Sequence, residues 1–273
     1  MKCLINRNIL CPITTLLPDF GLNGLYVAEM KTAILSLSRE VQIIDISHQV
    51  EKFDVRTGAF LLACAAPYFP EDTIPVAVVD PGVGTVSPPI IIQTRNACYV
   101  GPDNGVLALA ARNDDGPRSV HKINDRKLML PNVSSTFHGR DVFAPAAARL
   151  ANGTRPANSD PKSARSMPHI RTGHPEARDT GRRGNPHIDD FDNIITNFRP
   201  KDIRLVKTEP IFKARIKNTE LTLKLCKTYA EVPQHEPWAF MGSHSFLEIS
   251  MNQGNAAESL KTKEGDKIAI RLT

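Results

Sequence analysis

A seven-residue segment, IPVAVVD at 74–80, limits the possible folds more than any other part of the sequence. It is almost wholly apolar and rich in β-branched residues, and Pro81-Gly82 follows it, which is typical of a strand buried on both faces. Similar short runs recur through the first half of the sequence, and segments with helical spacing lie between several of them. Because strands alternating with helices form a layered, mainly parallel sheet, this pattern predicts an α/β N-terminal domain.

The spacing of apolar residues also predicts the individual elements. In the first half, the expected strands are 9–17, 41–46, 74–80, 89–94 and 97–101, and the expected helices are 26–37, 55–66, 105–112 and 142–152. In the second half, strand-like segments separated by turn residues occur at 188–198, 202–207, 211–216, 219–232, 245–252 and 266–273. This change of pattern predicts a smaller, all-β, barrel-like C-terminal domain.

A basic segment at 155–187 separates the two patterns. It holds seven Lys or Arg residues against three acidic ones, which accounts for four of the five net positive charges of the chain. It contains no aromatic residue, Leu or Val, so it cannot bury enough apolar surface to order itself. We interpret it as a flexible linker rather than a nucleic-acid-binding arm, which places the α/β domain at 1–154 and the barrel-like domain at 188–273.

Cysteine usage and hydropathy indicate the compartment. The five cysteines are an odd number, and no two of them have the C-x-x-C spacing, so a reducing compartment is the simplest interpretation. No apolar run approaches the length needed to cross a bilayer. The sequence therefore predicts a cytoplasmic protein with neither a membrane nor a nucleic-acid partner.

Several common catalytic and metal-binding motifs are missing from the sequence. It contains neither G-x-x-x-x-G-K-[ST] nor G-x-S-x-G, and Gly82-Val83-Gly84 lacks the third glycine of a dinucleotide-binding loop. The eight histidines show no zinc-like spacing with Cys or Glu, so no metal site is expected. Composition alone leaves a Ser–His–Asp hydrolase open, although nothing in the pattern positions a serine on a strand-to-helix elbow.

Polar residues gather instead where apolar strands end. Four motifs of this kind are Asp19-Phe20-Gly21, Asp80–Gly84, Gly101–Gly105 and Thr136–Asp141. Open α/β sheets bind their ligands at the carboxyl ends of their strands. Sequences such as D-P-G and P-D-N-G also form turns in their own right, so any one motif alone indicates only a turn. Four of them on successive units of one sheet favour a binding site.

These motifs, in this order, resemble the S-adenosylmethionine hydroxide adenosyltransferase family of S-adenosylmethionine hydrolases, which is related to the fluorinase and chlorinase. The resemblance covers nearly the whole chain except the linker, and rests on FDVRTGAFLL, VVDPGVGT, YVGPDNG, STFHGRDVFAPAAARLANG, HIDDFDNIITNF and MGSHSFLEISMNQGNAAE. It implies that water attacks the 5′ carbon of S-adenosylmethionine and releases adenosine and L-methionine. The sulfonium compound is then the substrate, and no separate cofactor is implied. The resemblance also implies a homotrimer with its site at a subunit interface.

The resemblance assigns roles to residues of the first half. Asp19 matches the carboxylate that accepts hydrogen bonds from both ribose hydroxyls, and Phe53 matches an aromatic residue near the ribose. Asp80 and His138 match two members of the family's Asp–Arg–His set that activates water. The related halogenases carry Tyr at both of these positions, so Asp80 and His138 point to water rather than halide as the nucleophile.

Further roles fall in the second half. Asp189 matches the residue that contacts the methionine amino group, and Phe191 and Tyr229 match an aromatic sandwich around adenine. Asn193 matches a residue that hydrogen-bonds adenine. The remaining matches are Ser243 and His244 at the methionine carboxylate, and Asn255 and Ala256 in the loop whose backbone contacts the adenine edge.

The catalytic set departs from the family pattern at one position. The arginine that should follow Asp80 by seven residues is Ser87, and serine cannot stabilise a developing hydroxide as arginine would. Lesser departures are Pro18 for threonine, Gly24 for an acidic residue and Asp192 for glycine. The alternatives are a slow hydrolase, a hydrolase with a substitute cation, and a non-catalytic protein that binds S-adenosylmethionine or a nucleoside. A halide-using relative is less favoured.

Overall fold

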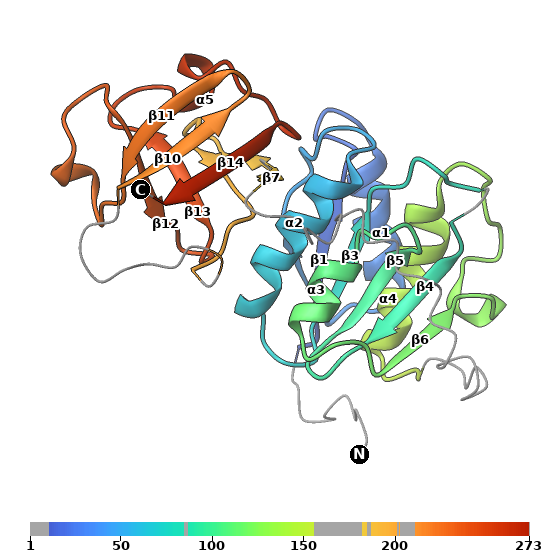
Figure 1. The fold of residues 1–273 in the computed structure, drawn as a ribbon. Helices are drawn as coiled ribbons and strands as arrows, with labels where there is room; N and C mark the ends of the chain where they lie inside the picture. Colours follow the sequence, from blue (N-terminus) through green and yellow to red (C-terminus); the bar gives the residue numbers. More distant parts are fainter. Residues whose placement is uncertain are drawn as a thin grey trace. The chain divides into compact units, whose positions relative to one another are not determined.

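A computed structural model describes residues 11–84, 87–155, 182–184, 187–200, 202 and 211–272. The chain divides into two compact units, Met1–Gly173 and His174–Thr273, both drawn in Figure 1. We describe each unit by itself. Most of the predicted linker, 156–181, lies outside the described residues, so its flexibility stays a prediction.

The first unit is built on a six-stranded sheet in the order β2-β1-β3-β5-β4-β6. Its strands are β1 (Ile13–Pro18), β2 (Gln42–Asp45), β3 (Ile74–Val78), β4 (Pro89–Gln93), β5 (Cys98–Pro102) and β6 (Ser119–Lys122). Strand β1 is parallel to β2 and β3, and β3 is parallel to β5. Strand β4 is antiparallel to both neighbours. The predicted α/β domain with a mainly parallel sheet is therefore confirmed.

Helices cover both faces of this sheet. They are α1 (Tyr26–Leu37), α2 (Val55–Ala65), α3 (Ala108–Asn113) and α4 (Ala144–Ala151). Helices α1 and α4 pack together over one face, and α2 and α3 over the other (Figure 1). Successive residues of a strand point to opposite faces, so Leu16 belongs to the core under α1 and α4, and Leu17 to the core under α2 and α3. This two-sided burial explains the uninterrupted apolar strands of the sequence.

Two helices of this unit begin later than their apolar spacing predicts. Helix α3 starts at Ala108 rather than at 105, because Gly105 has φ of 103° and turns the chain before the helix. A π-helical turn, η3 (Gly139–Phe143), precedes α4 and takes up the first two residues of the expected helix. Helix α2 begins where expected, because the Asp54 side chain accepts the N–H groups of Arg56 and Thr57.

The second unit contains two four-stranded antiparallel sheets, in the orders β11-β10-β14-β7 and β12-β13-β9-β8. The strands are β7 (Arg182–Gly184), β8 (His187–Ile188), β9 (Ile194–Ile195), β10 (Ile211–Ile216), β11 (Thr219–Lys224), β12 (Pro237–Met241), β13 (Leu247–Met251) and β14 (Lys267–Leu272). Both sheets contribute to one core, which includes Phe212, Leu223 and Leu247. The only helix of α type described there is the four-residue α5 (Ala256–Ser259), so a mainly β C-terminal domain is confirmed.

Three segments of the second unit differ from the sequence-based elements. Strand β7 lies inside the predicted linker 155–187 and pairs with β14, so that end of the segment belongs to the β-sheet. The expected strand 219–232 ends at Lys224, and its last residues form a turn that closes through the N–H of Glu231 and the carbonyl of Thr228. The expected strand 202–207 lies outside the described residues apart from Asp202.

Within the described part of the chain, none of the helices has the length and apolar character needed to cross a membrane.

Candidate active site

The end of β1 carries Asp19, the first candidate site residue. Its side chain is buried, and Oδ2 accepts the backbone N–H of Phe53 at 2.8 Å. Burial raises the pKa of the Asp19 carboxyl, and the hydrogen bond from Phe53 opposes the rise. Phe53 has φ of 70° and a side chain that is 65% exposed. This hydrogen bond holds the backbone of Phe53 against the Asp19 carboxylate, and the Phe53 ring stays exposed.

Asp80 follows β3, the strand paired in parallel with β1. The register places Pro18 opposite Val78, so Asp19 and Asp80 leave neighbouring strands at the same edge of the sheet. Oδ1 of Asp80 accepts the N–H of Gly82 at 3.1 Å, whereas Oδ2 is buried and has no hydrogen-bond partner among the described residues. Burial raises the pKa of Asp80, the negative charge of Asp19 adds to the rise, and His138 opposes it.

His138 stands immediately before η3, and its Nδ1 atom is buried without a hydrogen-bond partner in the described part of the chain. His138 lowers the pKa of Asp80 through its charge, which indicates that the two predicted catalytic side chains lie near each other. Gly84 sits at φ of 74°, and a Cβ there would meet the carbonyl oxygen of Ser135 at 2.5 Å. The loop after Asp80 therefore packs directly on the segment that leads to His138.

Aromatic residues form an apolar wall beside this site. Phe20, Tyr26 and Phe137 make edge-to-face contacts with one another, with ring centroids 4.9–5.8 Å apart. Gly139 lies against this cluster, because a Cβ would approach the rings of Phe20 and Phe137 to 3.1–3.2 Å. The residue after His138 is thus held close to the aromatic wall.

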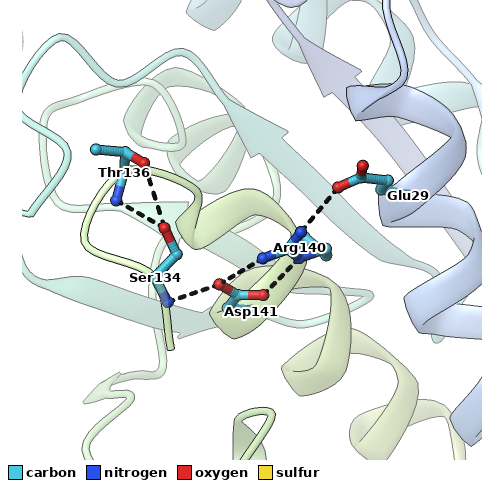
Figure 2. A network of polar contacts seen from close by, with 5 residues as sticks. All are labelled: Glu29, Ser134, Thr136, Arg140 and Asp141. Carbon is cyan, nitrogen blue, oxygen red and sulfur yellow. Dashed lines mark hydrogen bonds and ion pairs between the residues drawn. The ribbon is translucent and has the colours of Figure 1, made fainter. Parts of the chain in front are cut away.

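Ser87, at the position of the family arginine, is partly buried. The motif that contains His138 carries a cation of its own, Arg140, two residues after the histidine. Its guanidinium is taken up by two carboxylates, with Nε 2.7 Å from Asp141 and Nη1 2.9 Å from Glu29 (Figure 2). Arg140 is therefore committed to its own ion pairs, which argues against it as a substitute for the missing arginine.

The Arg140 network, which was not predicted from the sequence, supports the His138 segment. Asp141 is only 1% exposed, and its Oδ2 accepts the backbone N–H of Ser134 at 2.7 Å (Figure 2). The Ser134 hydroxyl in turn accepts the N–H of Thr136. Together these bonds tie the loop before His138 to α1 through Glu29. In the sequence, only the adjacent opposite charges of Arg140 and Asp141, close after His138, could have indicated this network.

In the second unit, Asp189 organises the turn between β8 and β9. Its Oδ1 accepts the N–H groups of Phe191 and Asn193 at 3.0 and 2.9 Å, and Oδ2 accepts the Asn193 side-chain amide at 2.9 Å. Asp192 within the turn has φ of 62°, in the left-handed region that favours glycine. The turn geometry thus explains the glycine that the family pattern has at this position.

Tyr229 joins this turn through its hydroxyl group. The Tyr229 hydroxyl lies 3.5 Å from Oδ1 of Asn193, and it accepts a hydrogen bond from Ser250 at 3.2 Å. One edge of its ring contacts Trp238 at 4.8 Å between centroids. The Tyr229 side chain is nevertheless 43% exposed and that of Phe191 is 78% exposed. Both predicted adenine-stacking residues thus present free ring surface.

The remaining predicted residues lie in two loops of the second unit. Ser243 and His244 are exposed between β12 and β13, with Oγ and Nδ1 3.3 Å apart. Asn255 caps α5 by accepting the N–H of Glu258, and Ala256 is buried. The N–H of Ala257 donates to the carbonyl of Asp192, which ties α5 to the Asp189 turn. Hydrogen bonds therefore join Asp189, Asn193, Tyr229 and the 255–256 loop, whereas Ser243 and His244 stand on a turn of their own.

A buried acidic residue, Glu248, lies near Asp189 and was not predicted from the sequence. Glu248 on β13 is 7% exposed, and burial raises its pKa to about 7, with a further contribution from the charge of Asp189. In the sequence, the position of this glutamate between apolar residues in SFLEIS could have indicated that it is buried.

Comparison with known proteins covers both units. The family model described as SAM hydroxide adenosyltransferase N-terminal domain matches residues 14–160, and the corresponding C-terminal domain model matches residues 186–269. An (R)-S-adenosyl-L-methionine hydrolase of Thermus thermophilus is 35% identical, over 94% of this chain and 97% of that protein. A protein of the same name from Methanocaldococcus jannaschii is also 35% identical, over 97% of each chain.

More distant relatives and a solved structure agree with this placement. A fluorinase of Nocardia brasiliensis is 22% identical, over 96% of this chain and 97% of that protein. The crystal structure of an uncharacterized conserved protein from Thermotoga maritima superimposes with a TM-score of 0.83 at 32% identity. That match covers 95% of this chain and all of the other.

Proposed function

The chain belongs to the S-adenosylmethionine hydroxide adenosyltransferase family, and from this premise we propose that it hydrolyses S-adenosyl-L-methionine to adenosine and L-methionine. The observation that carries the chemistry is that Asp80 and His138 lie close enough for their charges to interact. Both present a buried polar atom, Oδ2 and Nδ1, without a hydrogen-bond partner among the described residues. Buried polar atoms are rarely left in this state unless a ligand or water completes them.

The proposed step is an in-line displacement at the ribose 5′ carbon. The water oxygen forms a bond to this carbon, the carbon–sulfur bond breaks, and its electron pair leaves with the neutral thioether of methionine. Because the leaving group needs no proton, the site requires only a base and correct alignment. Asp80 accepts the water proton, and its raised pKa makes it a stronger base than an ordinary carboxylate. His138 orients the water beside it.

Electrostatics favour the same assignment. The substrate carries a positive sulfonium, and the carboxylates of Asp19 and Asp80 attract a cation. Asp19 has lone pairs left over after its bond to Phe53, and we assign them to the ribose hydroxyls. Phe53 then packs near the ribose. Ser87 has no positive charge to stabilise the developing hydroxide, so we propose that turnover is slow because the arginine is missing.

Residues of the second unit are proposed to recognise the adenine and methionine parts. Phe191 and Tyr229 sandwich adenine with their exposed ring faces, and Asn193 hydrogen-bonds its edge. Asn193 is already held by Asp189 and Tyr229, so it is oriented before the base arrives. The other proposed contacts are Asp189 to the methionine amino group, Ser243 and His244 to its carboxylate, and the backbone at Asn255 and Ala256 to adenine.

The names of the hydrolase relatives specify the (R) configuration at sulfur, and we infer the same preference here. An in-line attack requires the ribose and methionine groups to lie in fixed positions around the sulfur, so one epimer should fit. A preparation containing both epimers would test this. The (R) form should disappear and the (S) form should remain.

We further propose the assembly and setting implied by the family resemblance. The enzyme is a homotrimer with its site at a subunit interface, works in the cytoplasm, and needs neither a cofactor nor a metal. Light scattering of the purified protein tests the trimer. Activity that survives exhaustive chelation tests the metal-independence.

One experiment tests the function itself. The purified protein is incubated with S-adenosylmethionine in H₂¹⁸O, with and without chloride, and the products are identified by mass spectrometry. Hydrolysis yields methionine and adenosine labelled at the 5′ oxygen. Formation of 5′-chloroadenosine would instead indicate halide chemistry. Tight binding without product would leave a non-catalytic binding protein and overturn the hydrolase assignment.

A further inference from the structure

Glu248 is an acidic residue in the middle of an apolar strand. It lies on β13, opposite Ile195 of β9 on one side and Phe240 of β12 on the other. Its side chain is 7% exposed, and within the described part of the chain no donor forms a hydrogen bond to its carboxylate. A carboxylate that receives no hydrogen bond from the protein keeps its full acceptor capacity for a ligand.

The chain leaves space for this carboxylate at Gly242. A Cβ on Gly242 would overlap the Glu248 side chain, so any larger residue there would displace the carboxylate. Gly242 begins the turn that carries Ser243 and His244, and its N–H donates to the carbonyl of Phe246 at 2.9 Å. The carboxylate of Glu248 therefore lies against the turn proposed to hold the methionine carboxylate.

Asp189 is the second acidic group of this region. Burial raises the pKa of Glu248 to about 7, and the negative charge of Asp189 contributes to this rise. Asp189 already accepts three hydrogen bonds from its own turn, two at Oδ1 and one at Oδ2. Glu248 accepts no hydrogen bond from the described residues, so it has more lone pairs available to a ligand than Asp189 has. Two carboxylates in one site favour a cationic ligand over a neutral or anionic one.

We propose that Glu248, in addition to Asp189, binds the α-ammonium group of the substrate's methionine part. The inference rests on the proposed function and names the residue that makes the amino acid end of the substrate specific. An ammonium group carries three N–H donors and a full positive charge, which matches a buried carboxylate without donors. The neighbouring turn at 242–246 then receives the substrate carboxylate attached to the same carbon.

The test compares two substrates with two variants. One substrate is S-adenosylmethionine, and the other is its desamino analogue, in which hydrogen replaces the ammonium group. Glu248→Gln removes the charge with little change of shape. We expect KM for S-adenosylmethionine to rise by about 10- to 100-fold in Glu248→Gln, with kcat within about threefold of the wild type. KM for the desamino analogue should be the same in both proteins.

The control variant is Glu220→Gln, which alters an exposed ion pair with Lys213 in the same unit. It should behave as the wild type with both substrates. Should Glu248→Gln fail to fold, Glu248→Asp retains the charge but shortens its reach. It should still raise KM for S-adenosylmethionine more than for the analogue. Equal changes for the two substrates would assign Glu248 a structural role and overturn the inference, as would no change for either.

The outcome separates this inference from the function itself. If the wild type forms adenosine but the variant does not distinguish the two substrates, only the role of Glu248 is wrong. If the wild type forms no adenosine, the hydrolase assignment fails, and calorimetric binding of the two compounds still tests Glu248. Weaker binding of S-adenosylmethionine alone in Glu248→Gln would then support the inference. Failure of the wild type to bind S-adenosylmethionine would overturn both.

Discussion

Oδ2 of Asp19 accepts the backbone N–H of Phe53, 34 positions further along the chain, at 2.8 Å. The bond fixes the carboxylate at the end of β1 and leaves Oδ1 and the spare lone pairs for a ligand. It also holds the chain at Phe53 in the left-handed conformation, at φ of 70°. One hydrogen bond thus sets the direction of two predicted ribose-binding residues.

Asp19→Asn should weaken substrate binding without unfolding the protein. The amide oxygen can still accept the Phe53 N–H, but the variant loses the charge and one acceptor for the ribose hydroxyls. We expect KM to rise by about 10- to 100-fold, with thermal stability near that of the wild type. Steady-state kinetics and thermal unfolding measure both. A large loss of stability would show that Asp19 serves the fold rather than the ribose.

Asp80 should determine the acidic limb of the pH profile. Its pKa is raised by burial, and the base is active only when deprotonated, so kcat/KM should fall as pH decreases through this raised pKa. The fall should occur above pH 3.8, the ordinary pKa of an aspartate. Asp80→Asn should lower kcat by about 10²- to 10⁴-fold. An unchanged kcat in this variant would mean that another group accepts the proton.

Ser87→Arg should increase turnover. The new guanidinium would stand where the family has its arginine and stabilise the developing hydroxide, so we expect kcat to rise by about 10- to 100-fold. Ser87→Met is the matched control, because it adds a long side chain without charge. An equal gain in both variants would point to packing, and no gain in Ser87→Arg would mean that another group already fills the role.

Glu248 should make folding stability depend on pH. Its folded pKa of about 7 lies above the ordinary value of 4.5, so the folded protein holds this proton more tightly than the unfolded chain. The free energy of unfolding should therefore be highest at low pH for this group and decrease as pH rises towards 7. The slope is at most about 1.4 kcal/mol per pH unit. Chemical denaturation of the wild type and Glu248→Gln at several pH values measures it, and equal slopes would contradict the assignment.

Asp141→Asn should destabilise the first unit. The buried carboxylate is bonded to Arg140 and to the Ser134 N–H, and asparagine, with one acceptor oxygen and no charge, cannot satisfy both donors (Figure 2). We expect the free energy of unfolding to fall by about 1–3 kcal/mol. Glu29→Gln, which alters the more exposed arm of the same network, should cost about 0–1 kcal/mol. Equal losses in the two variants would refute this division.

Local pattern predicted much of the fold. The apolar spacing of 26–37 matches α1 at both ends, and the buried runs at 74–80 and 89–94 contain β3 and β4. Element boundaries that depend on backbone geometry were harder to predict, as the start of α3 after Gly105 shows. Strands β6 and β12 were not expected, because SVHK and PWAFM lack a clear alternating or β-branched pattern.

The candidate site was predictable where motifs end strands, and less so where partners are distant. The loops that carry Asp80 and His138 meet at Gly84 and Ser135, and the order of motifs along the chain does not specify this contact. The pairing of Arg140 with Glu29 joins positions 111 residues apart, and no local signal specifies it. Glu248 was overlooked because a single acidic residue in a strand usually faces solvent. Its burial depends on the neighbouring strands and on the space at Gly242.

The contact of Gly84 with the Ser135 carbonyl has a consequence for the two loops that it joins. Any side chain at position 84 would clash with the Ser135 carbonyl oxygen and push apart the loops that carry Asp80 and His138. The spacing of the two reactive groups is therefore set by a residue that has no reactive group of its own.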